Sequence, residues 1–137
     1  MFQHIFDSGS ILNVADLLYV NLDQTPQVML EEIRILVDTS EPRTVVLPRT
    51  TDFPVRNVKI TVVDVSGGAS LNNISVIPTS GVPLDSINGT TGFTIAIPYA
   101  STRFEVLSSN KYYSPNFLGG SSAVVSADNG LSLNGTV

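Results

Sequence analysis

The sequence predicts an all-β fold, an antiparallel β-sandwich or small barrel, preceded by an N-terminal arm that is extended or partly helical. Two observations lead to this class. The middle of the chain alternates apolar and polar residues with the period of a strand, and Gly, Pro and Asn separate the short runs at about the 8 to 12 residue spacing typical of sandwiches and barrels. With 137 residues, the chain is long enough for one compact domain and too short for two ordinary ones.

The first segment, residues 1–32, is predicted to be an acidic and apolar arm. It contains five acidic residues and no Lys or Arg, so the net charge of −5 of the whole chain lies within it. Ser10 could cap a short helix over residues 11–20, and Thr25-Pro26 has the form of a second helix start. The same residues also fit an extended conformation against a neighbouring subunit, and the pattern leaves both alternatives open.

The second segment, residues 33–113, is predicted to be the β-sandwich domain. Its clearest strand lies in residues 55–65, where Val58, Ile60 and Val62 form an apolar face and the side chains between them are largely polar. Alternating or β-branched runs predict further strands within residues 33–37, 45–47, 74–77, 93–97 and 103–106.

Between two of these strands, the sequence predicts a tight structural turn that closes a hairpin. Short side chains with an oxygen accept backbone N–H groups in such turns, and glycine tolerates a positive φ there. An Asn that follows can bond to open backbone before strand pairing resumes. The residues predicted to build the turn are Asp64, Ser66, Gly67, Gly68 and Asn73, with Asn72 as the alternative to Asn73.

This hairpin is part of a longer pattern, because residues 84–95 repeat the order of strand, Asn-Gly turn and strand. Over about residues 55–113 the arrangement resembles a β-rich module of bacteriophage and other virion structural proteins, found in decoration, head-fibre and tail-associated chains. That family often has Trp in its closing strand, whereas this chain has no Trp and has Lys111-Tyr112-Tyr113 in that place. The resemblance implies a virion protein and specifies a scaffold, not an activity.

The resemblance leads to a first hypothesis, an accessory protein on the capsid or tail surface of a virion. We expect a capsid decoration or cement protein, or the base of a head fibre, whose arm lies across a major capsid protein or a sister copy. A homo-oligomer, with a trimer as the first expectation from the family, would cover exposed strand edges. The expected partner-binding residues are the apolar side chains of the arm: Phe2, Ile5, Phe6, Leu12, Leu17, Leu18 and Tyr19.

A second hypothesis is a receptor- or carbohydrate-binding module on a tail or fibre. Aromatic side chains could form a platform for a sugar ring, or they could pack a strand edge and a subunit interface. The interface interpretation is favoured because the chain lacks Trp and offers no clear acidic partner. The candidate platform residues are Tyr99, Tyr112, Tyr113 and Phe117.

The sequence gives little reason to expect an enzyme, and a small hydrolase is the third hypothesis. The single His4 lies near the terminus, far from any Ser and Asp in the middle of the chain. Asp85 and Glu105 are the only carboxylates that neighbouring strands would bring together, and a surface or ion-paired role is favoured for them. Asp64 and its polar neighbours carry too few charges for calcium. We therefore expect no catalytic residue, no metal and no cofactor.

Composition limits the partners. Only 14% of the residues are charged, against about 25% in an average domain, and residues 114–137 form a polar C-terminal segment in which Asp128 is the only charge. Seven basic residues in an acidic chain argue against nucleic acid, which is bound largely through Lys and Arg. No apolar run reaches the roughly 18 to 20 residues of a membrane span. We therefore expect a protein partner, not nucleic acid or a membrane.

Overall fold

A computed structural model describes residues 2–18, 32–52 and 58–115, which form a sandwich of two stacked sheets. The six-stranded sheet has the order β1-β3-β5-β9-β10-β7, and the four-stranded sheet has the order β2-β4-β6-β8. The elements are β1 (Phe2–Phe6), β2 (Ile11–Asn13), the 3₁₀ helix η1 (Val14–Leu17), β3 (Glu32–Val37), β4 (Arg43–Leu47), the 3₁₀ helix η2 (Thr50–Asp52), β5 (Lys59–Asp64), β6 (Ile74–Pro78), β7 (Ser86–Ile87), β8 (Phe93–Ile95), β9 (Ser101–Ser108) and β10 (Lys111–Tyr113).

The predicted strand-rich sandwich is confirmed, but the prediction that it is antiparallel is wrong. The pairs β1–β3, β3–β5 and β7–β10 are parallel in the large sheet, and β2–β4 and β4–β6 are parallel in the small one. Among the described strands, the antiparallel pairs are β5–β9, β9–β10 and β6–β8. Alternation along a strand specifies one buried face and does not specify the direction of the neighbouring strand, so the sequence pattern could not distinguish the two arrangements.

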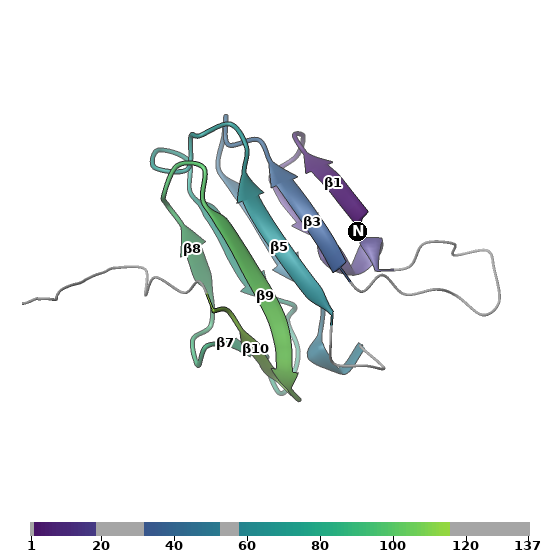
Figure 1. Ribbon diagram of the computed structural model, residues 1–137. Coiled ribbons are helices and arrows are strands. Elements are labelled where there is room, and N and C mark those ends of the chain that lie inside the picture. The colour runs from purple at the N-terminus through teal and green to yellow at the C-terminus, as the bar shows by residue number, and fades with distance from the viewer. Residues whose placement is uncertain (1, 19–31, 53–57, 116–137) are drawn as a thin grey trace, which may run out of the picture.

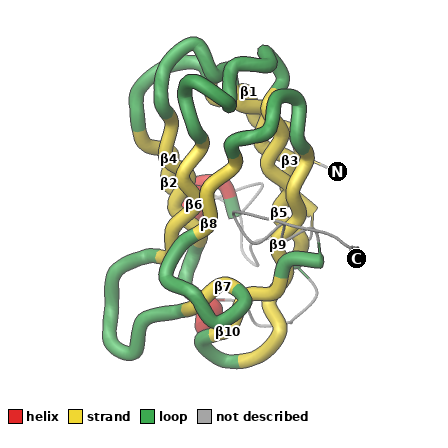
Figure 2. Tube along the Cα trace, turned by 90° about the vertical axis from the view of Figure 1, so that its left-hand side faces the viewer, coloured by secondary structure: helices red, strands yellow, loops and turns green. Residues whose placement is uncertain are grey.

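The parallel pairing among β1 to β6 follows from the path of the chain, which crosses from one sheet to the other after each of β1, β3 and β5 (Figure 2). We call these crossings arch 1 (residues 7–10), arch 2 (residues 38–42) and arch 3 (residues 65–73). Each arch joins two strands into a layer: β1 with β2 in layer 1, β3 with β4 in layer 2, and β5 with β6 in layer 3. The predicted hairpin is therefore an arch, because β5 and β6 lie in different sheets.

The structure does not support a separate N-terminal arm over residues 2–18. These residues form β1, β2 and η1, and the side chains of Phe6, Val14 and Leu18 belong to the common hydrophobic core. Burial of apolar area against layer 2 stabilises this position by roughly 25 cal/mol per Å², which an arm in solvent would forgo. The predicted helix over residues 11–20 is replaced by β2 and η1 as far as Leu18, and Thr25-Pro26 lies outside the described residues.

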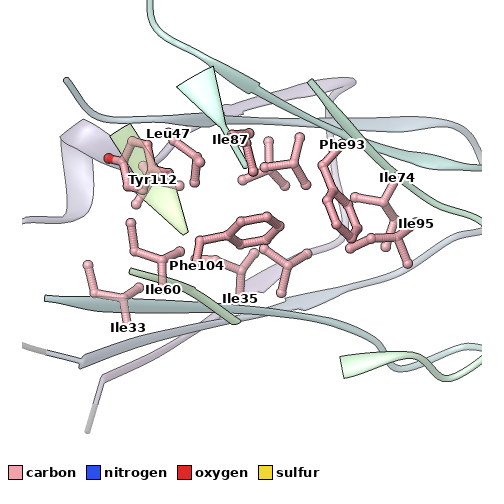
Figure 3. Packing of buried hydrophobic residues seen from close by; sticks show 14 of the residues in the cluster. Ile33, Ile35, Leu47, Ile60, Ile74, Ile87, Phe93, Ile95, Phe104 and Tyr112 are labelled. Atoms are coloured by element: carbon pink, nitrogen blue, oxygen red, sulfur yellow. The ribbon is translucent and has the colours of Figure 1, made fainter. Parts of the chain in front are cut away.

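The core lies between the two sheets and is formed by the inward-facing residues of every layer (Figure 3). The register stacks Ile33 beside Ile60 and Ile35 beside Val62 in the large sheet. Phe104 of that sheet and Phe93 of the small sheet meet edge to face across the core, with ring centroids 5.3 Å apart and planes at 90°, a favoured aromatic geometry. No helix in the described part of the chain is long and apolar enough to cross a membrane.

Candidate functional site

The most complete polar cluster of the described residues surrounds Asp64, at the end of β5. The side chain is 1% exposed. Its Oδ1 accepts hydrogen bonds from the Thr39 hydroxyl (2.7 Å), the Gly67 N–H (2.9 Å) and the Ser66 N–H (3.2 Å). Its Oδ2 accepts from the N–H groups of Ala69 and Tyr99, both at 3.1 Å. The carboxylate thus joins arch 2, arch 3 and the turn before β9.

Hydrogen bonding also determines the charge state of this cluster. Burial acts to raise the pKa of Asp64, but the hydrogen bonds from the Thr39 hydroxyl and from backbone N–H groups outweigh it, so the pKa of Asp64 lies below its usual value of 3.8. All of these donors are directed at the carboxylate, which leaves little capacity for a metal ion or a substrate. The described residues contain no group of three His, Cys, Asp or Glu side chains that could hold a metal ion.

The other predicted turn residues connect neighbouring arches. The Ser66 hydroxyl accepts the Thr39 N–H at 2.7 Å, so it bonds to arch 2 and not to its own turn. Gly67 has a positive φ of 83°. Gly68 does not, and it is required for a different reason: a Cβ there would lie 2.6 Å from the Thr39 carbonyl oxygen. The side chain that bonds to open backbone is that of Asn72, whose Nδ2 donates to the same carbonyl at 3.0 Å.

Asn73 contributes through its backbone. Its carbonyl accepts the Arg43 N–H at 3.4 Å, which links the end of arch 3 to the start of β4. The five residues predicted for the turn therefore lie together, and their contacts hold arch 3 against arch 2. Their role in the structure is to fix the arches.

A second buried carboxylate, Asp85, lies at the opposite end of the sandwich and is also satisfied. It is 3% exposed and accepts from the Thr50 N–H (2.9 Å), the Thr50 hydroxyl (3.0 Å) and the Asn110 Nδ2 (3.0 Å). Glu105, its predicted partner in a carboxylate pair, instead forms an ion pair with Arg103 at 2.8 Å. The two acids therefore do not share a site, and Asp85 fixes the loops at its end of the fold.

The aromatic residues predicted as a sugar platform do not form one surface. Tyr112 is 1% exposed in the core, and its hydroxyl donates to the Pro48 carbonyl. Tyr99 precedes β9, whereas Tyr113 pairs with Glu105 six residues further along, a separation of about 20 Å at roughly 3.3 Å per residue. Phe117 lies outside the described residues. Tyr99 and Tyr113 are exposed but separate.

The predicted partner-binding residues divide into a buried and an exposed group. Phe6 and Leu18 are buried in the core, Leu12 and Leu17 are partly buried against it, and Tyr19 lies outside the described residues. Phe2 and Ile5 remain accessible, with exposed fractions of 37% and 63%. Ile11, which the sequence analysis did not select, is 65% exposed. The accessible apolar residues of this region lie on β1 and β2.

These two strands form what we call the open edge, because in the described part of the chain each has a neighbour on one side only. The Phe6 carbonyl accepts the Asp38 N–H at 3.0 Å. Backbone groups alternate in direction along a strand, so His4 and Phe6 bond to β3, while the N–H and C=O of Gln3 and Ile5 point away from the sheet. In the small sheet, the Ser10 carbonyl accepts the Thr44 N–H at 2.8 Å. The N–H and C=O groups of Ile11 and Asn13 therefore point away from that sheet.

The sequence of β1 contains nothing that discourages pairing with another strand. Proteins protect exposed edges with charged residues, Pro or bulges, or by making the edge strand very short. β1 has five residues and β2 has three, with no charged residue and no Pro in either. β1 is also the longest of the four edge strands, because β7 has two residues and β8, like β2, has three. The open edge can therefore bind an additional strand, with exposed Ile5 and Ile11 beside it.

Arg43 holds layer 1 in place, and the sequence analysis did not identify it. It is 2% exposed. Its Nε donates to the Asp38 carbonyl at 2.8 Å, and its Nη1 donates to the Gly9 carbonyl of arch 1. The guanidinium carbon also lies 5.3 Å from the centroid of the Phe6 ring, a cation–π distance. One buried cation thus connects arch 1, arch 2 and the core at the open edge.

A scan against models of known protein families finds no match to this chain, and no curated protein matches its sequence. The resemblance to virion proteins therefore stays a prediction from the sequence, and the open edge is the feature on which a functional proposal can be built.

Proposed function

We propose that this chain is a non-enzymatic structural protein of a virion, a capsid decoration or head-fibre-base protein that joins other virion subunits by strand addition at the open edge. The observation that carries the proposal is the unprotected backbone of β1 and β2 beside exposed Ile5 and Ile11. The resemblance of residues 55–113 to virion modules supplies the biological setting.

Strand addition suits this surface. An added strand obtains its affinity from main-chain hydrogen bonds, here to the outward N–H and C=O groups of Gln3 and Ile5, and its specificity from neighbouring side chains. Asp7 and Asp16 are exposed close to the two strands, so a partner with a basic surface would be attracted and steered. A major capsid protein or a sister copy could supply the strand.

The buried carboxylates also favour a structural role over an enzymatic one. Catalytic acids need an open position for a substrate and a pKa near the working pH. Asp64 has a lowered pKa and is surrounded by five donors. Asp85 is bound by Thr50 and Asn110. Both carboxylates are thus committed to holding loops.

The test is occupancy of the particle. In the virus that encodes the chain, Ile5→Lys is expected to lower the number of copies per purified particle at least about tenfold, because it places a charge beside the added strand. Leu71→Lys is the matched control, since Leu71 is 89% exposed in arch 3, away from the open edge. Quantitative mass spectrometry of purified particles gives the copy number.

Two results would contradict this proposal. If the wild-type chain is missing from the particles, the virion role is wrong. If both Lys variants keep full occupancy while folded, the open edge is not the attachment surface.

One observation favours the alternative, a receptor- or carbohydrate-binding module. Tyr99 has a positive φ of 61°, rare for a bulky residue, and such strained positions cluster at functional sites. Its N–H is fixed by Asp64, its ring lies over Gly67, and it is 68% exposed. Under this alternative, Tyr99→Ala abolishes adhesion of the particle to cells and Ile5→Lys does not.

A further inference from the structure

We propose that the first strand added to the open edge comes from a second copy of this chain, through antiparallel pairing of β1 with β1 about a two-fold axis. The inference deepens the proposed function by naming a partner for the same surface, and it rests on that proposal only for its biological setting. A two-fold pair takes the place of the trimer that the family resemblance implied.

The backbone of β1 selects one register for this pairing. In an antiparallel ladder, residues whose N–H and C=O point outward must face each other to exchange hydrogen bonds. On β1 these are Gln3 and Ile5. Pairing Gln3 with Ile5 of the second copy, and Ile5 with Gln3, satisfies both and uses the whole length of Phe2–Phe6. The two-fold axis then passes between the two His4 residues.

The side chains agree with this register. Phe2, His4 and Phe6 face inward, because they are in register with buried Ile33, Ile35 and Val37. In the pair, Phe2 of one copy lies opposite Phe6 of the other, so the half-exposed Phe2 ring would extend the second core. β1 contains no Asp, Glu, Lys or Arg, so no like charges face each other across the axis.

A head-to-tail arrangement is less favourable. It would set β1, with five residues, against β7, with two, and most of the outward groups of β1 would stay unpaired. In a two-fold contact, β1 pairs with β1 of the second copy, so the two strands have the same length. The assembly is complete with two copies. The lengths of the two edge strands therefore favour a dimer over a filament.

The experiment is disulfide trapping in the purified chain, which contains no natural Cys. The two His4 residues would form a non-hydrogen-bonded pair with Cα atoms about 4.5 Å apart, within the roughly 4.4 to 6.8 Å that a disulfide spans. His4→Cys is therefore expected to give a covalent dimer on mild oxidation. Adding Gln3→Pro, which removes one outward N–H and leaves the bonds to β3, should suppress this product at least about tenfold.

Ile5→Cys is the matched control. Its two copies would be diagonal neighbours about 7 to 8 Å apart, too far for a disulfide. Since Ile5 is 63% exposed and His4 is less exposed, random collisions would cross-link Ile5→Cys faster, the opposite of the order expected here. Ile5→Cys reacting as fast as His4→Cys, or no product from either variant when both are folded, would overturn the proposal.

Light scattering keeps the proposal testable if His4→Cys does not fold. The wild-type chain is expected to have twice the monomer mass of 14.6 kDa, and Ile5→Lys the monomer mass. A folded wild-type monomer at all concentrations would overturn the proposal. Both measurements use the purified chain without particles, so the two proposals can fail separately. If the chain forms the dimer but is absent from particles, only the virion role is refuted. If the chain is bound to particles but is a monomer in solution, only the dimer is refuted.

Discussion

At the scale of single residues, Asp64 shows which contacts the local sequence can predict and which it cannot. Its hydrogen bonds to Ser66 and Gly67 join residues two and three positions apart in the sequence, and they follow from known turn chemistry. Its bonds to Thr39 and Tyr99 span 25 and 35 residues, and no local pattern contains them. The same holds for Gly68, whose lack of a side chain serves contact with arch 2 and not a positive φ.

Asp64→Asn is expected to destabilise the protein by about 1 to 3 kcal/mol at pH 7. The amide N–H₂ would replace an acceptor that faces several buried N–H donors, and a charged acceptor would be lost. Urea denaturation measures the change in free energy of unfolding. Asp7→Asn, in the exposed arch 1, is the control and is expected to change it by less than about 0.5 kcal/mol.

The pH dependence gives the same prediction a second readout. Because the pKa of Asp64 is lowered in the folded state, its contribution is present above the usual value of 3.8 and is lost as the pH falls through the folded pKa. The wild type should therefore lose stability below about pH 4, and Asp64→Asn should lose less. Some loss remains, since the backbone hydrogen bond from Ser40 also lowers the pKa of Asp38. Equal acid sensitivity of the two proteins would contradict this role.

At the scale of elements, the sequence identified the strands of layers 2 and 3 but not their connections. The predicted runs at residues 33–37, 45–47 and 74–77 lie within β3, β4 and β6, because each buries one face. An arch and a hairpin join the same alternating strands, so the pattern does not distinguish them. The strand β1 was missed because Phe2, Ile5 and Phe6 do not alternate with polar residues.

A signal for the arches is present in the chain, although it is weak. Phe6, Val37 and Asp64 occupy one register position in successive layers, 31 and then 27 residues apart. At each position an Asp is followed by Ser or Thr within two residues. The three segments are Phe6-Asp7-Ser8, Val37-Asp38-Thr39 and Asp64-Val65-Ser66. The repeat is difficult to recognise in the sequence, because its spacing is unequal and its residues vary. It becomes clear only when the arches are seen stacked in the structure.

Arg43→Met is expected to loosen layer 1 selectively. The variant keeps an apolar stem, but the carbonyls of Gly9 and Asp38 lose their charged donor, which costs about 2 kcal/mol. The amide hydrogens of β1 should exchange with solvent at least about tenfold faster, while those of β5 keep their protection. Arg49→Met is the control, because the bond from Arg49 to the Pro83 carbonyl is long, 3.3 Å, and exposed. Uniform loss of protection in β1 and β5 would show that Arg43 supports the whole fold instead.

At the scale of the whole molecule, three stacked layers end at β7 and β8 on one side and at the open edge on the other. The sequence analysis predicted partner contact in this region, and Phe2 and Ile5 are exposed there. It could not separate them from Phe6 and Leu18, because apolar residues of a core and of an interface look alike in sequence. Which apolar residues face a partner depends on how the layers stack.

This placement changes what a truncation should do. A dispensable arm could be removed without harm, but deleting residues 1–18 takes Phe6, Val14 and Leu18 out of the core. Each fully buried side chain of this kind contributes roughly 1.5 to 3 kcal/mol, and together they approach the 5 to 15 kcal/mol that is typical for a whole domain. The deletion is therefore expected to lower the Tm in a circular dichroism melt by more than about 15 °C, or to prevent soluble expression. Phe2→Gln combined with Ile5→Gln removes exposed apolar area and keeps those three side chains, so its Tm should stay within about 5 °C. A truncated chain that melts like the wild type would show that layer 1 is an arm after all.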